Sequence, residues 1–297
     1  IANMSDRRGV YLVGAVMIFV FCMKGALFPL FTWMNRSYVA PPIAVSIIFG
    51  ALLTKVGLYS IIRTYGLFYY ESNFIKSYLL ILGAISIIAG CIGAIYQKDL
   101  KQIVVFNIVI SLGVMVCGTA TLNTFGVKGT LFYAVNDILL KAALFIIVGL
   151  IIYVSGVKYI QKCGLINKYP LLGWTYFIVV LSLAGVPPFS GFYGKALIIK
   201  GLVANNNTFI AILVALSGLV VFYSLIKIFL NVFYDNINKS LILKPLPKGV
   251  QIPLIAIVAI ALIIGVSSNL LEGFFDKGIQ MVLNPQHYID LVLKKGA

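Results

Sequence analysis

The sequence has few charged residues and lacks the residue clusters that bind metals or form disulfide frameworks. Only 10% of its 297 residues are charged, whereas roughly 25% is usual in soluble domains. Its four cysteines (Cys22, Cys91, Cys117 and Cys163) are far apart and form no CxxC pair, and its one histidine, His287, lies in the polar tail. This pattern excludes a recognisable metal centre or disulfide scaffold. We therefore expect no metal and no cofactor.

Enzyme motifs are also missing. There is no phosphate-binding loop and no nucleophile placed beside a base, so the sequence does not predict an enzyme. The chain begins with Ile1 and shows no signal-peptide pattern, and a truncated start is one interpretation of that beginning.

What the chain has in excess is apolar sequence. Hydrophobic residues make up 61% of it and the mean hydropathy is +1.05, against roughly 45–50% apolar residues in soluble domains. The bilayer must be the solvent for most of this surface. The net charge of +15 would suggest nucleic acid in a soluble protein. Here the basic residues occupy short connections between apolar runs, where topology and anionic headgroups explain them, so we expect the lipid bilayer and no nucleic acid as a partner.

The apolar runs predict an all-α, polytopic membrane protein with about eight transmembrane helices, since each needs about 20 apolar residues. The expected spans are 10–34, 42–65, 77–97, 102–122, 129–155, 171–201, 208–233 and 251–272. Residues 1–273 form one transmembrane domain, and residues 274–297 are a polar, interfacial tail. One side of the membrane is richer in basic residues and is expected to be cytoplasmic: Arg36, Lys98, Lys101, Lys158, Lys162, Lys168, Lys239, Lys244 and Lys248.

Two of these spans are interrupted. The first contains Pro29, five residues after Lys24, which predicts a kink or a break. The sixth contains Gly185, Pro187, Pro188 and Gly191, which predict a true break because proline removes a backbone donor and clashes with the preceding turn. Broken helices at membrane depth are tolerated where they lie within protein or line a wet cavity, and a pair of them points to a transport site.

Four lysines lie deep in apolar sequence: Lys24, Lys55, Lys141 and Lys195. Each costs about 2.5–3.5 kcal/mol at the centre of a span on insertion scales. A carboxylate partner, a wet cavity or loss of the proton must compensate. Lysine can lose its proton when buried, whereas arginine cannot, so a row of lysines can pass protons. For a single lysine, reaching out to the membrane interface remains an alternative.

Asp137 and Lys141 are four residues apart and share a helix face. The pair is interpreted either as an ion pair that lets the helix insert or as part of a proton relay. Polar residues that could link the lysines through water, or simply bond helix to helix, are Ser46, Thr54, Ser60, Asn107, Ser111, Asn136, Ser182 and Ser190.

The residues around these lysines resemble a known family, the proton-translocating antiporter-like subunits of Mrp-type cation/proton antiporters and of respiratory complex I. The resemblance rests on the segments 24–33, 40–42, 53–59, 97–102 and 181–195. Thr54-Lys55-Val56-Gly57 and Asn136-Asp137 to Lys141 look most like the D subunit of the Mrp complex.

The resemblance implies a fold of about fourteen spans with two inverted five-helix repeats, of which this chain would hold the end of the first repeat and all of the second. It implies that Lys24 exchanges a proton with a glutamate outside this chain, that Lys55 and Lys141 relay it, and that Lys195 passes it on.

The implied function is proton translocation through buried lysines in a multisubunit Na+/H+ antiporter of the bacterial plasma membrane, with other subunits as partners. Li+ and K+ stay open as the exchanged cation. The alternative is a proton-pumping subunit of complex I or of a membrane-bound hydrogenase. A third hypothesis is a scaffold that only holds other subunits.

Overall fold

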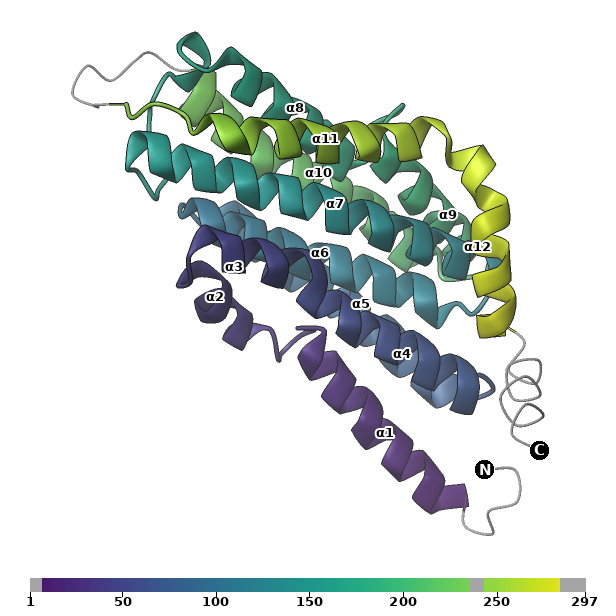
Figure 1. The fold of residues 1–297 in the computed structure, drawn as a ribbon. Coiled ribbons are helices and arrows are strands. Elements are labelled where there is room, and N and C mark those ends of the chain that lie inside the picture. Colours follow the sequence, from purple (N-terminus) through teal and green to yellow (C-terminus); the bar gives the residue numbers. More distant parts are fainter. Residues whose placement is uncertain (1–6, 235–242, 284–297) are drawn as a thin grey trace, which may run out of the picture.

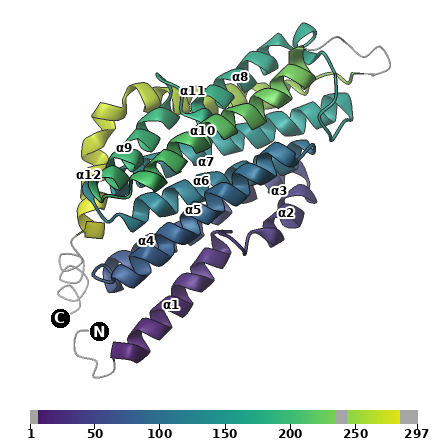
Figure 2. The ribbon, with the colours of Figure 1, turned by 180° about the vertical axis from the view of Figure 1, so that it is seen from behind.

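The described residues of this computed structural model, 7–234 and 243–283, form a bundle of long helices without a β-strand among them. The long helices run side by side in both views, with α6 and α7 in the middle (Figures 1 and 2). The elements are α1 Arg7–Lys24, α2 Thr32–Val39, α3 Ile43–Ile48, η1 Phe49–Leu53, α4 Thr54–Phe68, α5 Asn73–Tyr96, α6 Leu100–Ala120, α7 Thr124–Ser155, η2 Leu165–Asn167, α8 Pro170–Ala184, α9 Ser190–Ala204, α10 Thr208–Ile228, η3 Phe229–Tyr234, α11 Lys248–Val266 and α12 Ser268–Leu283.

Polar caps set where the central helices begin. Asp99 accepts hydrogen bonds from the backbone amides of Lys101 and Gln102 at the start of α6 (2.9 and 3.1 Å). Asn123 accepts one from Gly126 at the start of α7 (2.7 Å). These side chains satisfy amides that a helix leaves without internal partners.

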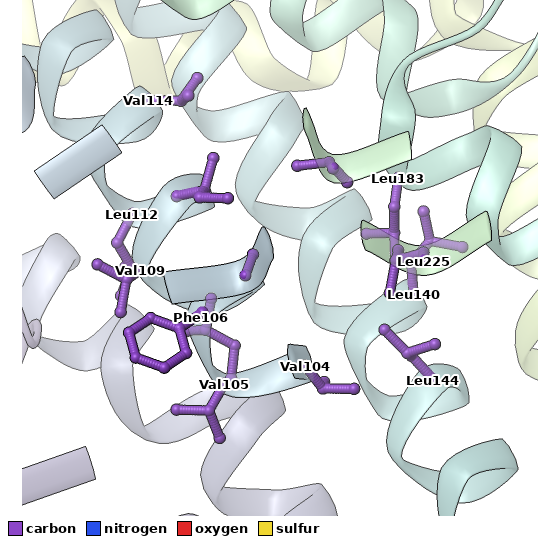
Figure 3. Close-up of a cluster of buried hydrophobic side chains, with 14 of the residues drawn as sticks. Val104, Val105, Phe106, Val109, Leu112, Val114, Leu140, Leu144, Leu183 and Leu225 are labelled. Atoms are coloured by element: carbon purple, nitrogen blue, oxygen red, sulfur yellow. The ribbon is translucent and has the colours of Figure 1, made fainter. Parts of the chain in front are cut away.

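The core is built around α6, whose 18-residue apolar window is entirely buried. Its valines and leucines form one buried cluster with Leu140 and Leu144 of α7, Leu183 of α8 and Leu225 of α10 (Figure 3). A helix that is apolar all round is a buried one, which explains why α6 lies at the centre.

The expected spans are confirmed as helical segments, but their number is not settled. Within residues 7–234 and 243–283, five helices are long and apolar enough to cross a membrane: 43–68, 73–96, 100–120, 124–155 and 208–234. The other three expected spans coincide with shorter apolar helices at 12–24, 170–184 and 249–265. The count of eight therefore stays a prediction.

Both predicted interruptions are present. In the first span the helix stops at Lys24 and α2 begins at Thr32, with Pro29 between them. In the sixth, α8 ends at Ala184 and α9 begins at Ser190. The first interruption is thus a break and not a mere kink.

The C-terminal part ends in α12, which lies across the end of the bundle (Figure 1). The expected boundary between the domain (1–273) and the tail (274–297) falls inside this helix. His287 and the tail beyond Leu283 lie outside the described residues, as does Lys239. The division into domain and tail stays a prediction.

Candidate functional site

Lys55 lies in the middle of the bundle, two residues after a π-helical turn. The turn η1 (Phe49–Leu53) joins α3 to α4, and such turns are frequent at functional sites. The ammonium of Lys55 lies 2.7 Å from Asp137 Oδ2 and donates to the carbonyl of Gly50 within the turn, at 3.4 Å. Only 7% of the side chain is exposed, so this is a buried ion pair between α4 and α7.

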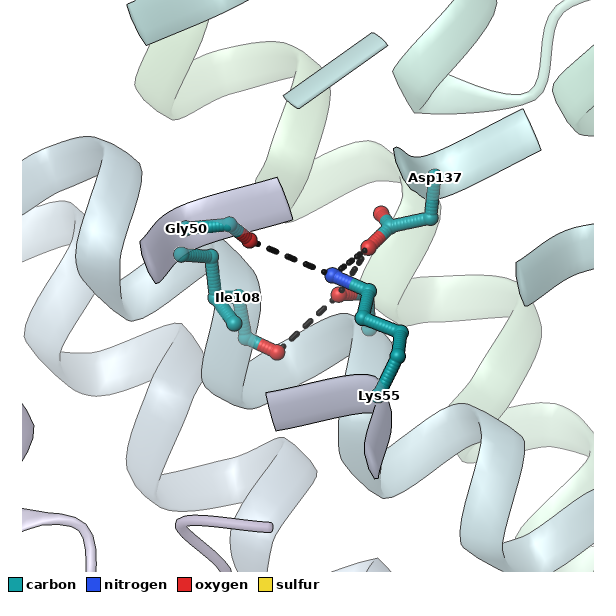
Figure 4. Close-up of polar contacts among 5 residues, drawn as sticks. Gly50, Lys55, Ile108 and Asp137 are labelled. Atoms are coloured by element: carbon teal, nitrogen blue, oxygen red, sulfur yellow. Dashed lines mark hydrogen bonds and ion pairs between the residues drawn. The ribbon is translucent and has the colours of Figure 1, made fainter. Parts of the chain in front are cut away.

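Asp137 is fully buried and receives a second contact from α6. Ser111 Oγ lies 3.2 Å from Asp137 Oδ2 and 3.0 Å from the carbonyl of Ile108 (Figure 4). Asp137 Oδ1 has no hydrogen-bond partner among the residues that the structure describes. Buried polar atoms nearly always have a partner, so this carboxylate oxygen departs from the usual pattern.

Lys141 differs from the expectation drawn from its spacing. It lies one turn after Asp137 on α7 and is buried, but within 7–234 and 243–283 it makes no ion pair. The carboxylate of Asp137 pairs with Lys55 instead. Sequence spacing places residues on one face of a helix but does not reveal a lysine that another helix brings to the same carboxylate. Of the two interpretations of Asp137 and Lys141, the ion pair is wrong, and the proton relay stays a prediction.

Lys195 is held by the break between α8 and α9. Its ammonium donates to the carbonyls of Leu183 and Ala184, at 2.9 Å each, and lies 5.7 Å from the centre of the Tyr133 ring. The last carbonyls of a helix have no partners within the helix and carry partial negative charge. The break therefore supplies ligands to a buried cation.

Gly185 makes this arrangement possible. Its φ is +83°, a conformation that favours glycine. A Cβ on Gly185 would lie 3.0 Å from Lys195 Cδ. Pro187 and Pro188 follow in the exposed part of the break, and Gly191 lies in the first turn of α9, where a Cβ would collide with the carbonyl of Ser182.

Lys24 stands apart from the other three lysines. It is the last residue of α1, which lies along one edge of the bundle (Figures 1 and 2), and its side chain is exposed. In the described part of the chain it has no hydrogen bond or ion pair. Gly57 lets α4 approach it, since a Cβ there would lie 2.9 Å from the carbonyl carbon of Lys24.

A line of polar side chains links α7 to the two helices that flank the break, α8 and α9. Ser190 Oγ makes a very short hydrogen bond to Asn136 Oδ1, and Ser182 Oγ lies 3.3 Å from Ser190 Oγ. Asn136 precedes Asp137 in the chain, and Ser182 precedes Leu183, whose carbonyl holds Lys195. These side chains therefore join α7, α8 and α9 between the two lysine sites.

Besides the carbonyls that hold Lys195, sequence reasoning missed two further partners, Gly50 and Tyr133. Gly50 acts through its backbone carbonyl, which leaves no mark in a sequence. Tyr133 lies four residues before Asp137 and could have been found by helical spacing. Two of the other polar residues that were expected to link the lysines have different partners. Asn107 bonds Ser224 of α10 at 3.1 Å, whereas Ser60 bonds a carbonyl of its own helix.

No group of three potential metal-binding side chains occurs in the residues searched, those that the structure describes. The geometry thus defines a class: a polytopic helical membrane protein with lysines and one carboxylate buried between its spans, beside a broken helix.

Comparison with known proteins specifies the family. The family described as "NADH:quinone oxidoreductase/Mrp antiporter, TM" matches residues 1–220, and the chain belongs to it. The chain is 38% identical to the D subunit of the Na+/H+ antiporter of Bacillus subtilis over 299 residues, which cover 98% of this chain and 60% of that protein. The resemblance seen in the sequence is confirmed.

Two solved structures share the fold. The Mrp complex from Dietzia sp. DQ12-45-1b matches with a TM-score of 0.91 at 23% identity, covering 97% of this chain and 62% of that one. Respiratory complex I from Thermus thermophilus matches with a TM-score of 0.83 at 24% identity, covering 95% and 59%. The chain thus spans about 60% of the length of these relatives. Its apolar helices and its family make it a multi-pass protein of the cell membrane.

Proposed function

We propose that this chain carries part of the proton pathway of a multisubunit Na+/H+ antiporter in the bacterial plasma membrane. The observation that carries the proposal is the buried Lys55–Asp137 ion pair, at 2.7 Å. Asn136, next to Asp137 in the chain, is hydrogen-bonded to Ser190 at the start of α9, after the break that holds Lys195. The 38% identity to a protein named as the D subunit of a Na+/H+ antiporter supports antiport and an assembly with other subunits.

The chemistry of the ion pair suits proton transfer. A carboxylate accepts a proton and a buried lysine can release one, whereas an arginine keeps its charge. A proton that arrives at Asp137 neutralises the carboxylate and frees Lys55 from its partner.

The route proposed from here follows the lysines in space. Lys24, exposed at the edge of the bundle, receives the proton from a group outside this chain. Lys55 with Asp137 takes it next, and Lys141 lies one turn along the same helix. Lys195, reached past Asn136, Ser190 and Ser182, releases it toward the other side or a neighbouring subunit. Water fills the gaps between side chains that do not touch.

Antiport in everted vesicles tests the proposal. The vesicles come from cells that lack sodium/proton exchange and express the whole assembly. Lys24→Ala and Lys195→Ala are expected to abolish Na+-driven proton movement. Lys227→Ala, near the end of α10 and away from the proposed route, is the matched control and should keep most of the activity. Unchanged activity in both test variants would refute the relay. Repeating the assay with Li+ and K+ identifies the cation.

A second candidate function is favoured by the structural match to respiratory complex I. There the same lysines would be driven by redox chemistry in other subunits. Co-purification with iron–sulfur or quinone-binding partners would select this alternative. The scaffold hypothesis predicts instead that lysine substitutions act on assembly and leave turnover per assembled complex unchanged, which blue-native gels beside the vesicle assay distinguish.

A further inference from the structure

A pocket opens at the end of the bundle where α8 and α11 begin. Its volume is about 170 Å³, and a wider opening continues from it. Both share Lys168, Tyr169, Leu246 and Gln251 in their walls. The two helices lie next to each other in both views (Figures 1 and 2), so the pocket faces the surroundings of the bundle and is separate from the buried lysines.

The connections at this end carry an excess of positive charge. Backbone hydrogen bonds tie them together: Leu100 to Lys158, Ile160 to Lys98, and Lys244 to Val154. The described lysines of these connections are Lys98, Lys101, Lys158, Lys162, Lys168 and Lys244. The one acidic residue within their described parts, Asp99, is engaged in capping α6. An anion at this end therefore meets little repulsion.

Aromatic side chains place this end at the membrane surface. Tyr153, Tyr159 and Trp174 are 49%, 62% and 56% exposed. Tyrosine and tryptophan gather where the apolar bilayer meets the headgroups. The pocket mouth therefore lies at the depth of lipid headgroups.

The walls of the pocket combine polar and apolar side chains. Lys168 and Gln251 lie at the mouth, and Lys168 donates to the carbonyl of Leu243 at 3.3 Å, which leaves two of its three ammonium protons for a ligand. Tyr169 donates to the backbone carbonyl of Lys244 at 2.8 Å, which places this second lysine near the opening, and the Lys244 ammonium lies 5.8 Å from the centre of the Tyr153 ring. Leu171 and Ile255 line the apolar part.

The apolar part continues onto the outer surface of the bundle. Leu171 and Ile255 are 53% and 43% exposed, and Ile252 is 76% exposed. A cationic mouth above an apolar wall at headgroup depth matches a molecule with an anionic head and a hydrocarbon tail. Basic pockets between membrane helices bind the headgroups of such lipids.

We propose that this pocket binds one anionic glycerophospholipid of the bilayer. Its phosphate lies at Lys168 and Lys244, with Gln251 donating to a headgroup oxygen. One acyl chain lies along Leu171 and Ile255. The lysines select an anionic headgroup over a zwitterionic one, and the apolar wall selects a lipid over free phosphate.

Native mass spectrometry tests the site on the protein purified in its assembly in neutral detergent. The probes are phosphatidylglycerol, phosphatidylcholine and inorganic phosphate. Tight binding of one phosphatidylglycerol, with weaker binding of phosphatidylcholine, is expected. Lys168→Gln should weaken phosphatidylglycerol binding about fivefold, because this is the usual contribution of one lysine to the attraction of anionic lipid at a membrane surface. Lys76→Gln, near the start of α5 at the opposite end of the bundle, is the matched control and should bind as the unmodified protein does.

A second variant tests the acyl chain. Ile255→Trp fills the apolar part of the pocket without touching a charge, and it should weaken binding of both lipids. Three results would overturn the proposal: equal affinity for the two lipids, wild-type binding in both variants, or binding of inorganic phosphate as tight as that of phosphatidylglycerol, which would indicate a simple anion site.

Discussion

The two buried lysines with defined partners, Lys55 and Lys195, are held in different ways. Lys55 pairs with a carboxylate, Asp137. Lys195 is bound by two backbone carbonyls at the end of α8. A carboxylate can itself take up a proton, whereas a carbonyl only orients its dipole toward the cation.

This difference assigns different tasks to the two sites in the proposed pathway. Lys55 and Asp137 can exchange a proton between them. Lys195 changes its charge only by giving its proton to something that reaches it, because its own ligands cannot accept it. The helix break thus stabilises a cation without adding a second titrating group.

The largest effect is expected from removing the carboxylate. Asp137→Asn leaves Lys55 buried without its counter-charge, and breaking such a pair costs roughly 3–5 kcal/mol. We expect antiport in everted vesicles to fall at least about tenfold, because a loss of only 1.4 kcal/mol already corresponds to a factor of ten. The melting temperature of the assembly should also drop. Asp276→Asn, in a half-exposed pair with Lys128 at 3.3 Å, is the control and should change little. Wild-type transport by Asp137→Asn would show that the pair is not on the pathway.

The next effect separates charge from proton release. Lys55→Arg preserves a cation beside Asp137 but holds its proton. We expect assembly on blue-native gels close to that of the unmodified protein, with antiport largely lost. Lys227→Arg serves as the comparison outside the site. Transport retained by Lys55→Arg would mean that Lys55 acts only as a fixed charge.

A moderate effect is expected at the carbonyl-bound lysine. Gly185→Ala adds a Cβ 3.0 Å from Lys195 Cδ at a φ of +83°, and a non-glycine residue in this region costs about 1–2 kcal/mol. Gly156→Ala provides a matched control, because Gly156 has a φ of +72° but no neighbour within 4 Å of an added Cβ. Both variants should lose similar stability in thermal unfolding. Only Gly185→Ala should also reduce transport. Equal transport by the two variants would show that Gly185 does not affect transport through Lys195.

The smallest effect is expected from the hydroxyl beside the ion pair. Ser111→Ala removes one contact to Asp137 Oδ2 and should cost about 0.5–1.5 kcal/mol, the usual net contribution of one hydrogen bond, because this oxygen keeps its pair with Lys55. We expect a several-fold fall in antiport with assembly preserved. Ser217→Ala, whose hydroxyl bonds its own helix at 2.7 Å, should leave antiport unchanged. A Ser111→Ala variant no different from Ser217→Ala would contradict a role for this contact.

Much of the architecture could be predicted from the sequence, because hydropathy and proline act locally. The apolar runs located the helices, and Pro187 with Pro188 located the break in the sixth span. Pro29 was ambiguous, since a single proline is compatible with a kink or a break. Whether each lysine is buried or exposed was harder to predict. Burial of Lys55, Lys141 and Lys195 followed from their apolar neighbours, but the exposure of Lys24 depends on what packs around α1.

Partners across helices could not be predicted from spacing. Asp137 and Lys141 lie four residues apart, which favours a pair, yet α4 brings Lys55 to the same carboxylate. The carbonyls that bind Lys195 belong to the backbone, and no side-chain pattern reports them. Such contacts depend on how the helices pack, which the one-dimensional pattern does not contain.

The central claim is that Asp137 changes its proton state during transport while paired with Lys55. Infrared difference spectroscopy of the assembled protein in vesicles, with the pH stepped on one side, measures this directly. The account predicts a carboxylic-acid carbonyl band that appears with the step in the unmodified protein and is missing in Asp137→Asn, while Asp276→Asn retains it. A spectrum without such a band, or one that is the same in Asp137→Asn, would contradict it.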